Sequence, residues 1–99
     1  MYQHEKCFIY CITDPITNEP RYIGKTVCGE IRFKNHLSKS KLIKKTKKNN
    51  WIKSLLKKDK TPIFQILEFG KPEELGDLEV FYISYFKYLG FKLLNMTLS

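Results

Sequence analysis

The sequence lacks any long hydrophobic run. None of its apolar stretches approaches the roughly 20 residues that a helix needs to cross a bilayer. Positions 1–6 also lack the cationic region, apolar stretch and cleavage site of a secretory signal. We therefore expect no membrane partner and a cytoplasmic location, or a place in the nucleus or in a virus-infected cell.

Cysteine is scarce, and its placement excludes two kinds of small domain. There are three cysteines, an odd number that does not make a disulfide framework. Cys7 and Cys11 share one face of a predicted strand, which is not the spacing of a zinc knuckle. A reducing compartment suits such a chain better than an oxidising one.

The apolar and aromatic residues are numerous enough to form one hydrophobic core. The 99 residues are 42% hydrophobic and 14% aromatic, which indicates a single globular domain over 1–99. We find no internal repeat and no linker.

The charge is strongly positive, and lysine is concentrated in the middle of the chain. The formal net charge is +8. Eleven of the lysines fall between positions 34 and 60, namely Lys34, Lys39, Lys41, Lys44, Lys45, Lys47, Lys48, Lys53, Lys57, Lys58 and Lys60. A one-sided basic surface is typical of proteins that bind nucleic acid through phosphate contacts. The alternative that composition leaves open is a solvated, lysine-rich face with no partner.

Alternation and turn residues predict three strands, over 6–13, 21–25 and 63–69. Helical spacing predicts three helices: one over 30–41, one from Asn49 or Asn50 to 58, and one from Pro72 to about 89, ended by Gly90. Residues 44–48 are too charged for anything except an exposed connection. The order β-β-α-α-β-α predicts an α+β fold, a small three-stranded antiparallel sheet flanked by helices.

The first two strands bring two phenols together. If Tyr10 pairs opposite Tyr22 in an antiparallel hairpin, both phenols lie on one side of it together with Gly24, because residues i and i+2 share a face. A phenol transfers a proton near neutral pH only when its pKa is lowered from about 10, and a neighbouring cation such as Lys25 does this. The competing interpretation is that both tyrosines are ordinary strand and core residues.

Glu79 breaks the pattern of the last predicted helix. It falls at the margin of an apolar stripe that comprises Leu75, Leu78, Tyr82, Phe86 and Leu89. A carboxylate at the edge of a core costs several kcal/mol unless it is paired, hydrogen-bonded or bound to a metal. A salt bridge to Arg32 or Lys25, or a side chain that reaches solvent, would explain Glu79 equally well.

Arg32 and His36 lie four residues apart on one helical face. Alone they indicate a solvated surface or a phosphate site, since arginine offers a planar fork and histidine a single donor. Together with the phenols, Lys25 and Glu79, they form the set that phosphodiester hydrolysis needs. That reaction requires a base, cations for the developing charge, and a carboxylate to hold a divalent metal.

At these residues the chain resembles the GIY-YIG nuclease family. The hairpin motif is present as Phe8-Ile9-Tyr10 and Tyr22-Ile23-Gly24, with Lys25-Thr26 after it. Arg32 with His36 is similar to the family's Arg-x-x-x-His helix, and 78–83 is similar to its Leu-Glu-x-x-Tyr-Ile helix. Asn95 stands where a closing asparagine is expected. The resemblance covers nearly the whole chain in the right order.

The resemblance implies a metal-dependent endonuclease that cuts DNA, duplex or branched, into 5′-phosphate and 3′-hydroxyl ends. Tyr10 is the preferred general base with Tyr22 close behind, and Lys25 lowers the pKa of the phenol. Arg32 clamps the phosphate and His36 orients or relays. Glu79 is the protein ligand to Mg²⁺ or Mn²⁺, and Asn95 positions the phosphate or supports the site.

Phe8 departs from the family pattern, which has glycine at the start of the first motif. It either crowds the approach of DNA or fills the sheet, and it leaves the catalytic side chains unchanged.

The source of target recognition stays open. DNA contacts are expected from Lys39, Lys41, Lys44, Lys45, Lys47 and Lys48, and a homodimer, a separate targeting subunit or a longer enzyme would each add recognition. The alternative functions are a basic nucleic-acid-binding module that does not cut and, last, a protein–protein adaptor that uses Tyr85 and Tyr88.

Overall fold

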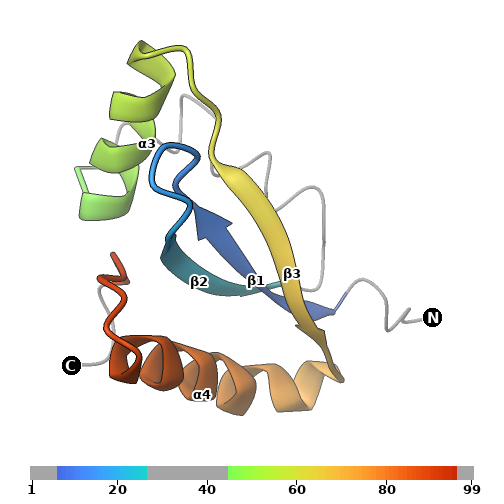
Figure 1. Ribbon diagram of the computed structural model, residues 1–99. Helices are drawn as coiled ribbons and strands as arrows, with labels where there is room; N and C mark the ends of the chain where they lie inside the picture. The colour runs from blue at the N-terminus through green and yellow to red at the C-terminus, as the bar shows by residue number, and fades with distance from the viewer. Residues whose placement is uncertain (1–6, 27–44, 96–99) are drawn as a thin grey trace.

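The computed structural model describes residues 7–26 and 45–95 (Figure 1). In chain order the elements are β1 (Phe8–Thr13), β2 (Pro20–Thr26), α3 (Lys47–Lys57), β3 (Ile63–Phe69), the 3₁₀ helix η2 (Pro72–Glu74) and α4 (Leu75–Tyr88). The predicted α+β class and the three-stranded antiparallel sheet are confirmed. The helix predicted over 30–41 lies outside the described residues.

Strand β1 is the centre of the fold. The strand order is β2-β1-β3, so β1 pairs on both edges, and all six of its residues are buried. Alternate side chains point to opposite faces, where they enter two separate cores. Ile9 and Cys11 pack toward α4, whereas Phe8, Tyr10 and Ile12 pack on the other face with Trp51 of α3. Figure 1 accordingly shows α3 and α4 on either side of the strands.

The hairpin register differs from the prediction by two residues. Tyr10 pairs with Gly24 and Tyr22 pairs with Ile12, so the predicted pairing of Tyr10 opposite Tyr22 is wrong. A shift of two residues keeps every side chain on its face, because the period of a strand is two. Both phenols therefore lie on the same face, as expected.

The hairpin turn is fixed by Asp14, which is buried. Its Oδ1 accepts hydrogen bonds from the backbone N–H of Ile16 (2.7 Å) and Thr17 (3.3 Å), and its Oδ2 accepts one from Trp51 Nε1 (3.1 Å). Burial alone would raise the pKa of Asp14, but these hydrogen bonds and the charge of Arg21 outweigh it and hold the pKa below its ordinary value. The Trp51 bond ties the turn to α3.

Helix α3 begins earlier than predicted. The Thr46 hydroxyl accepts a hydrogen bond from the Asn49 N–H (3.1 Å) and caps the helix, so neither Asn49 nor Asn50 is the cap. Lys47 consequently belongs to the helix and not to a connection. Ile52 and Leu55 are buried, whereas Leu56 is 41% exposed.

Strand β3 has the predicted bounds, and the helix after it starts in two stages. Pro72 opens η2, and α4 then runs from Leu75 until Gly90, with φ of 98°, ends it. Leu75 and Ile83 are buried against the sheet. Leu89 is 50% exposed, so its predicted place in the apolar stripe is wrong.

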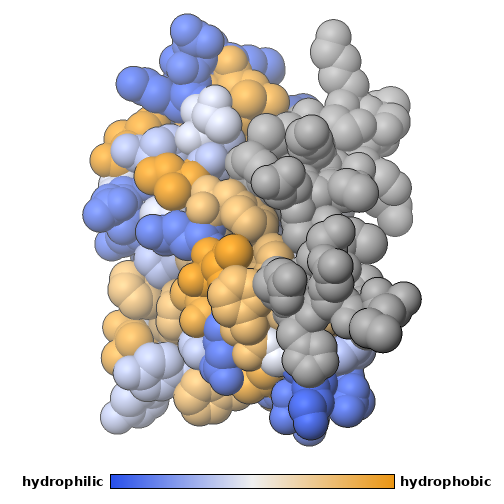
Figure 2. All heavy atoms as spheres, turned by 90° about the vertical axis from the view of Figure 1, so that its right-hand side faces the viewer, coloured by the Kyte–Doolittle hydropathy of each residue, from blue (hydrophilic) through white to orange (hydrophobic). Residues whose placement is uncertain are grey.

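Apolar side chains also remain on the surface. On β3, Ile66 is 46% and Phe69 51% exposed, and Figure 2 shows hydrophobic side chains gathered along the middle of one face of the molecule. On the outer side of α4 the rings of Phe81 and Tyr85 stack with centroids 5.8 Å apart. Among the residues described here, no helix is both long enough and apolar enough to cross a membrane.

Candidate active site

The two phenols occupy one face of the sheet in unequal surroundings. Tyr10 is 1% exposed and stacks on Phe64 with ring centroids 5.0 Å apart. Phe8 is buried beside it in an edge-to-face contact, so the residue that departs from the family pattern fills the sheet. Tyr22 is only partly buried. The face is therefore an apolar wall in which Tyr22 is the more accessible phenol.

Gly24 allows the Tyr10 ring to cross strand β2. A Cβ atom at Gly24 would overlap the Tyr10 ring and hydroxyl, so only glycine fits there. Because β2 is an edge strand, the Tyr10 hydroxyl is directed across β2 toward the rim of the sheet. The glycine of the second motif thus positions the tyrosine of the first.

The cation nearest to a phenol in this part of the chain is Lys48, in the first turn of α3. Its Nζ lies 5.4 Å from the centroid of the Tyr22 ring, a cation–π contact. Lys25, which we expected beside the phenols, points to the opposite face of β2, because it alternates with Gly24.

Lys25 instead meets Glu79. The Lys25 Nζ and Glu79 Oε1 atoms are 4.0 Å apart, with the side chains 49% and 25% exposed. Gly76, one turn before Glu79, leaves room for the ammonium, which lies 3.8 Å from the position of a Cβ there. The salt bridge between Glu79 and Lys25, one of the two that the sequence left open, is therefore present, and Arg32 lies outside the described residues.

Glu79 also suits a hard divalent cation. Its carboxylate is partly solvent-accessible, and its Oε1 lies 4.0 Å from the Lys25 Nζ. Within 7–26 and 45–95 no cluster of three or more His, Cys, Asp or Glu side chains could hold a metal. A metal bound here would keep most of its ligands as water and substrate oxygens, which is how Mg²⁺ is commonly held.

Asn95 closes the outer edge of β2. Its Oδ1 accepts a hydrogen bond from the Ile23 N–H (3.0 Å), and its Nδ2 donates one to the Ile23 carbonyl (2.7 Å). The preceding Leu94 N–H donates to the Arg21 carbonyl (2.6 Å), so the C-terminal segment runs along the edge like a short extra strand. Of the two roles expected for Asn95, this geometry favours support of the site over direct contact with phosphate.

Tyr82, which belongs to the last motif, is bonded elsewhere. Its hydroxyl donates to Glu68 Oε1 (2.7 Å) and so links α4 to β3. That hydrogen bond, and to a smaller extent burial, raises the pKa of Tyr82 above its ordinary value. A phenol with a raised pKa stays protonated at neutral pH, and the hydrogen bond to Glu68 gives Tyr82 a structural role.

The structure places only part of the predicted site. It brings Lys25 and Glu79 together, sets Tyr10 over Gly24 and puts Asn95 on the edge of β2. Arg32, His36, Lys39, Lys41 and Lys44 lie outside the described residues. Lys45 and Lys47 are exposed on the surface, and Lys48 is partly buried.

Sequence reasoning missed two features. It did not connect Asp14 to Trp51, because residues 37 positions apart give no local signal. It also did not single out the outer face of α3, although the helical spacing of Asn50, Lys53, Ser54 and Lys57 was a usable signal.

The comparisons with known proteins identify one family. A family model described as the GIY-YIG catalytic domain matches residues 6–90. The match includes both tyrosine motifs, Arg32, His36 and Glu79, and it ends before Asn95. Neither the curated proteins nor the solved structures gave a match.

Asn95→Ala should speed hydrogen exchange at the Ile23 amide. The variant removes the acceptor of that N–H, and a hydrogen bond contributes about 0.5–1.5 kcal/mol, so exchange should rise roughly tenfold when measured by NMR. The Gly24 amide is the internal control. In an antiparallel edge strand the N–H groups of successive residues point alternately outward and toward the neighbouring strand, so the Gly24 N–H points to β1. Unchanged exchange at Ile23 would show that Asn95 does not hold the edge.

Proposed function

Because the chain belongs to the GIY-YIG nuclease family, we propose that it is a metal-dependent endonuclease that hydrolyses DNA phosphodiester bonds. The products carry 5′-phosphate and 3′-hydroxyl ends. The observation that carries the proposal is the pairing of Lys25 with Glu79 at 4.0 Å, next in sequence to the glycine that Tyr10 crosses. A carboxylate and a cation therefore meet on one face of β2, and the Tyr10 phenol crosses the strand at the neighbouring residue on the other face.

Glu79 is the protein ligand to Mg²⁺ or Mn²⁺ in this proposal. The bound ion supplies a Lewis acid that stabilises charge on the phosphate and on the leaving oxygen. Lys25 places a positive charge 4.0 Å from the Glu79 carboxylate. Its ammonium, about half exposed, is also available to a phosphate oxygen.

Tyr22 is the better placed of the two candidate bases. A general base must be reached by the attacking water, and Tyr22 is partly exposed whereas Tyr10 is 1% exposed. The ammonium of Lys48 lies over the Tyr22 ring and so places a positive charge beside this phenol. Tyr10, packed across Gly24, then holds the shape of the wall and offers its hydroxyl at the rim.

The remaining residues of the family pattern complete the proposal. Arg32 clamps the scissile phosphate and His36 orients or relays, roles that the family resemblance supplies. Lysines near the start of α3 contact the DNA backbone without reading bases. The group comprises Lys39, Lys41, Lys44, Lys45, Lys47 and Lys48. A homodimer or a separate targeting domain or subunit would add sequence recognition and a second cut.

Glu79→Gln should abolish cutting. With Mg²⁺ or Mn²⁺ present, the variant should cut supercoiled plasmid and branched DNA at least 100-fold more slowly, because the neutral amide loses most of the attraction for the metal. Asp77→Asn is the matched control, since Asp77 is an exposed acid on the same helix and its loss changes the net charge equally.

Comparison of the two variants separates enzyme from binding module. If wild-type protein binds these DNAs but cuts none of them with either metal, the chain is a binding module and the proposed function is wrong. If Glu79→Gln cuts as fast as Asp77→Asn, Glu79 has no part in the reaction.

Tyr22→Phe should slow cutting more than Tyr10→Phe. Each change deletes one hydroxyl, and loss of a general base typically costs 10²–10⁴-fold. The pH profile of the cutting rate gives a second readout, because only loss of the base removes the rising limb. A larger loss in Tyr10→Phe, with the rising limb kept in Tyr22→Phe, would assign the base to Tyr10.

A further inference from the structure

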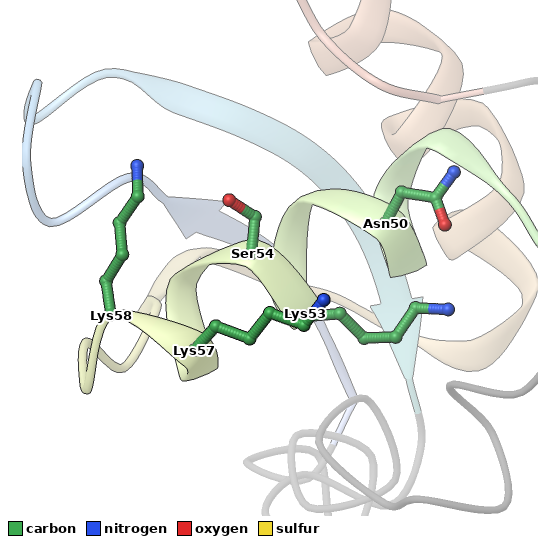
Figure 3. A pocket seen from close by; sticks show the side chains of 5 residues that line it. All are labelled: Asn50, Lys53, Ser54, Lys57 and Lys58. Atoms are coloured by element: carbon green, nitrogen blue, oxygen red, sulfur yellow. The ribbon is translucent and has the colours of Figure 1, made fainter.

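The outer face of α3 carries an open, cationic hollow. Its volume is about 390 Å³, and it is lined by Asn50, Lys53, Ser54, Lys57 and Lys58 (Figure 3). These residues recur at helical spacing on the side of α3 away from the buried Ile52 and Leu55. Figure 3 shows Lys58 at one end of the hollow and Asn50 at the other, with Ser54, Lys57 and Lys53 between them. The hollow therefore combines three ammonium groups with two neutral hydrogen-bonding groups.

The positive charge of α3 is not balanced along the chain. Between positions 45 and 58 there is no Asp or Glu, whereas the lysines are Lys45, Lys47, Lys48, Lys53, Lys57 and Lys58. In the part of the chain that the structure describes, no carboxylate lies within salt-bridge distance of Lys45, Lys47, Lys53, Lys57 or Lys58. An uncompensated cluster of this density has a high local affinity for an anion with several charges.

Helix α3 keeps these lysines at some cost to its own stability. Lys47 and Lys48 stand in the first turn, where the helix dipole favours acids, and no acid is present there. Lys53 and Lys57 are like charges at i, i+4, an arrangement that destabilises an isolated helix by roughly 0.2–0.5 kcal/mol. Lys48 gains a cation–π contact with Tyr22, whereas no described carboxylate offsets the repulsion between Lys53 and Lys57, which points to an anionic ligand.

The chemistry of the lining favours a phosphodiester backbone. Lys, Ser and Asn are the side chains that commonly contact phosphate oxygens in protein–DNA interfaces. No aromatic side chain lines the hollow, so bases would not stack there. A membrane surface is disfavoured because no apolar side chain lines the hollow, so none is available there to enter lipid.

We propose that the outer face of α3 binds the sugar–phosphate backbone of DNA, with Lys53 and Lys57 each contacting a phosphate and Asn50 and Ser54 donating hydrogen bonds. Lys53 and Lys57 are separated by about 6 Å of helix rise. The contact holds the strand without reading its sequence. It deepens the proposed function, on which it rests, by naming a second surface that fixes the substrate.

Binding can be measured independently of cutting. In the full chain with Glu79→Gln, we would add Lys53→Gln and Lys57→Gln and measure the affinity for a 20-bp DNA duplex, chosen as a probe of roughly two helical turns, at several salt concentrations. Each lost phosphate contact lowers the slope of log K against log[salt] by about 0.9, so the slope should fall by about 1.8. The affinity at low salt should fall at least tenfold.

The control has the same change in net charge at another place. Lys71→Gln with Lys92→Gln removes two exposed lysines outside α3 and should leave the slope nearly unchanged. Lys53→Arg with Lys57→Arg should restore the slope, and circular dichroism checks that every variant is folded.

Two results would overturn the proposal. One is an equal loss in the α3 pair and the control pair, which would mean that only net charge matters. The other is binding of poly-glutamate that is as tight as binding of the DNA duplex and that depends equally on Lys53 and Lys57. That result would make the face a site for acidic polypeptides. Failure of wild-type protein to cut DNA, with the α3 dependence intact, would refute the nuclease and leave this proposal standing.

Discussion

Burial of β1 on both faces is the constraint on which the rest of the structure depends. A strand with solvent on one side could tolerate polar alternation, but every residue from Phe8 to Thr13 is buried. Each large apolar side chain that is fully buried contributes about 1.5–3 kcal/mol, so both faces must be covered. Helix α4 covers one face, and Trp51 of α3 packs against the other. The carboxylate on α4 and the phenols of the hairpin are thereby assigned to opposite faces of the same sheet.

Strand β2 is where these two faces can cooperate, because it is an edge strand. Gly24 admits the Tyr10 ring from one face, and the adjacent Lys25 reaches Glu79 on the other. The C-terminal segment closes the edge only around Arg21 and Ile23, through Leu94 and Asn95. A phosphate at the rim beyond Ile23 would therefore meet groups from both faces. This geometry explains each residue from Tyr22 to Lys25. Tyr22 is the partly exposed phenol and Ile23 is a core residue. Gly24 is where the Tyr10 ring crosses the strand, and Lys25 is the cation that reaches Glu79.

Local patterns predicted the elements well, and contacts across the chain poorly. The bounds of β3 and the end of α4 at Gly90 followed from alternation and from glycine at a helix end. The hairpin register did not, because strand alternation is equally satisfied by shifts of two residues. Thr46 displaced the expected asparagine cap because any of several hydroxyl or amide side chains can cap a helix. The unusual place of Glu79 could be predicted from the interrupted apolar stripe, whereas its contact with Lys25 on another element became known only from the fold.

Binding of a divalent ion by Glu79 is the central claim, and paramagnetic NMR tests it most directly. Substoichiometric Mn²⁺ added to the wild-type protein should first broaden the amide signals of Lys25, Gly76 and Glu79, which the structure places together. Glu79→Gln should remove this localised broadening while the rest of the spectrum stays unchanged. Broadening that is centred elsewhere, or that persists in Glu79→Gln, would contradict the assignment of Glu79 as the metal ligand.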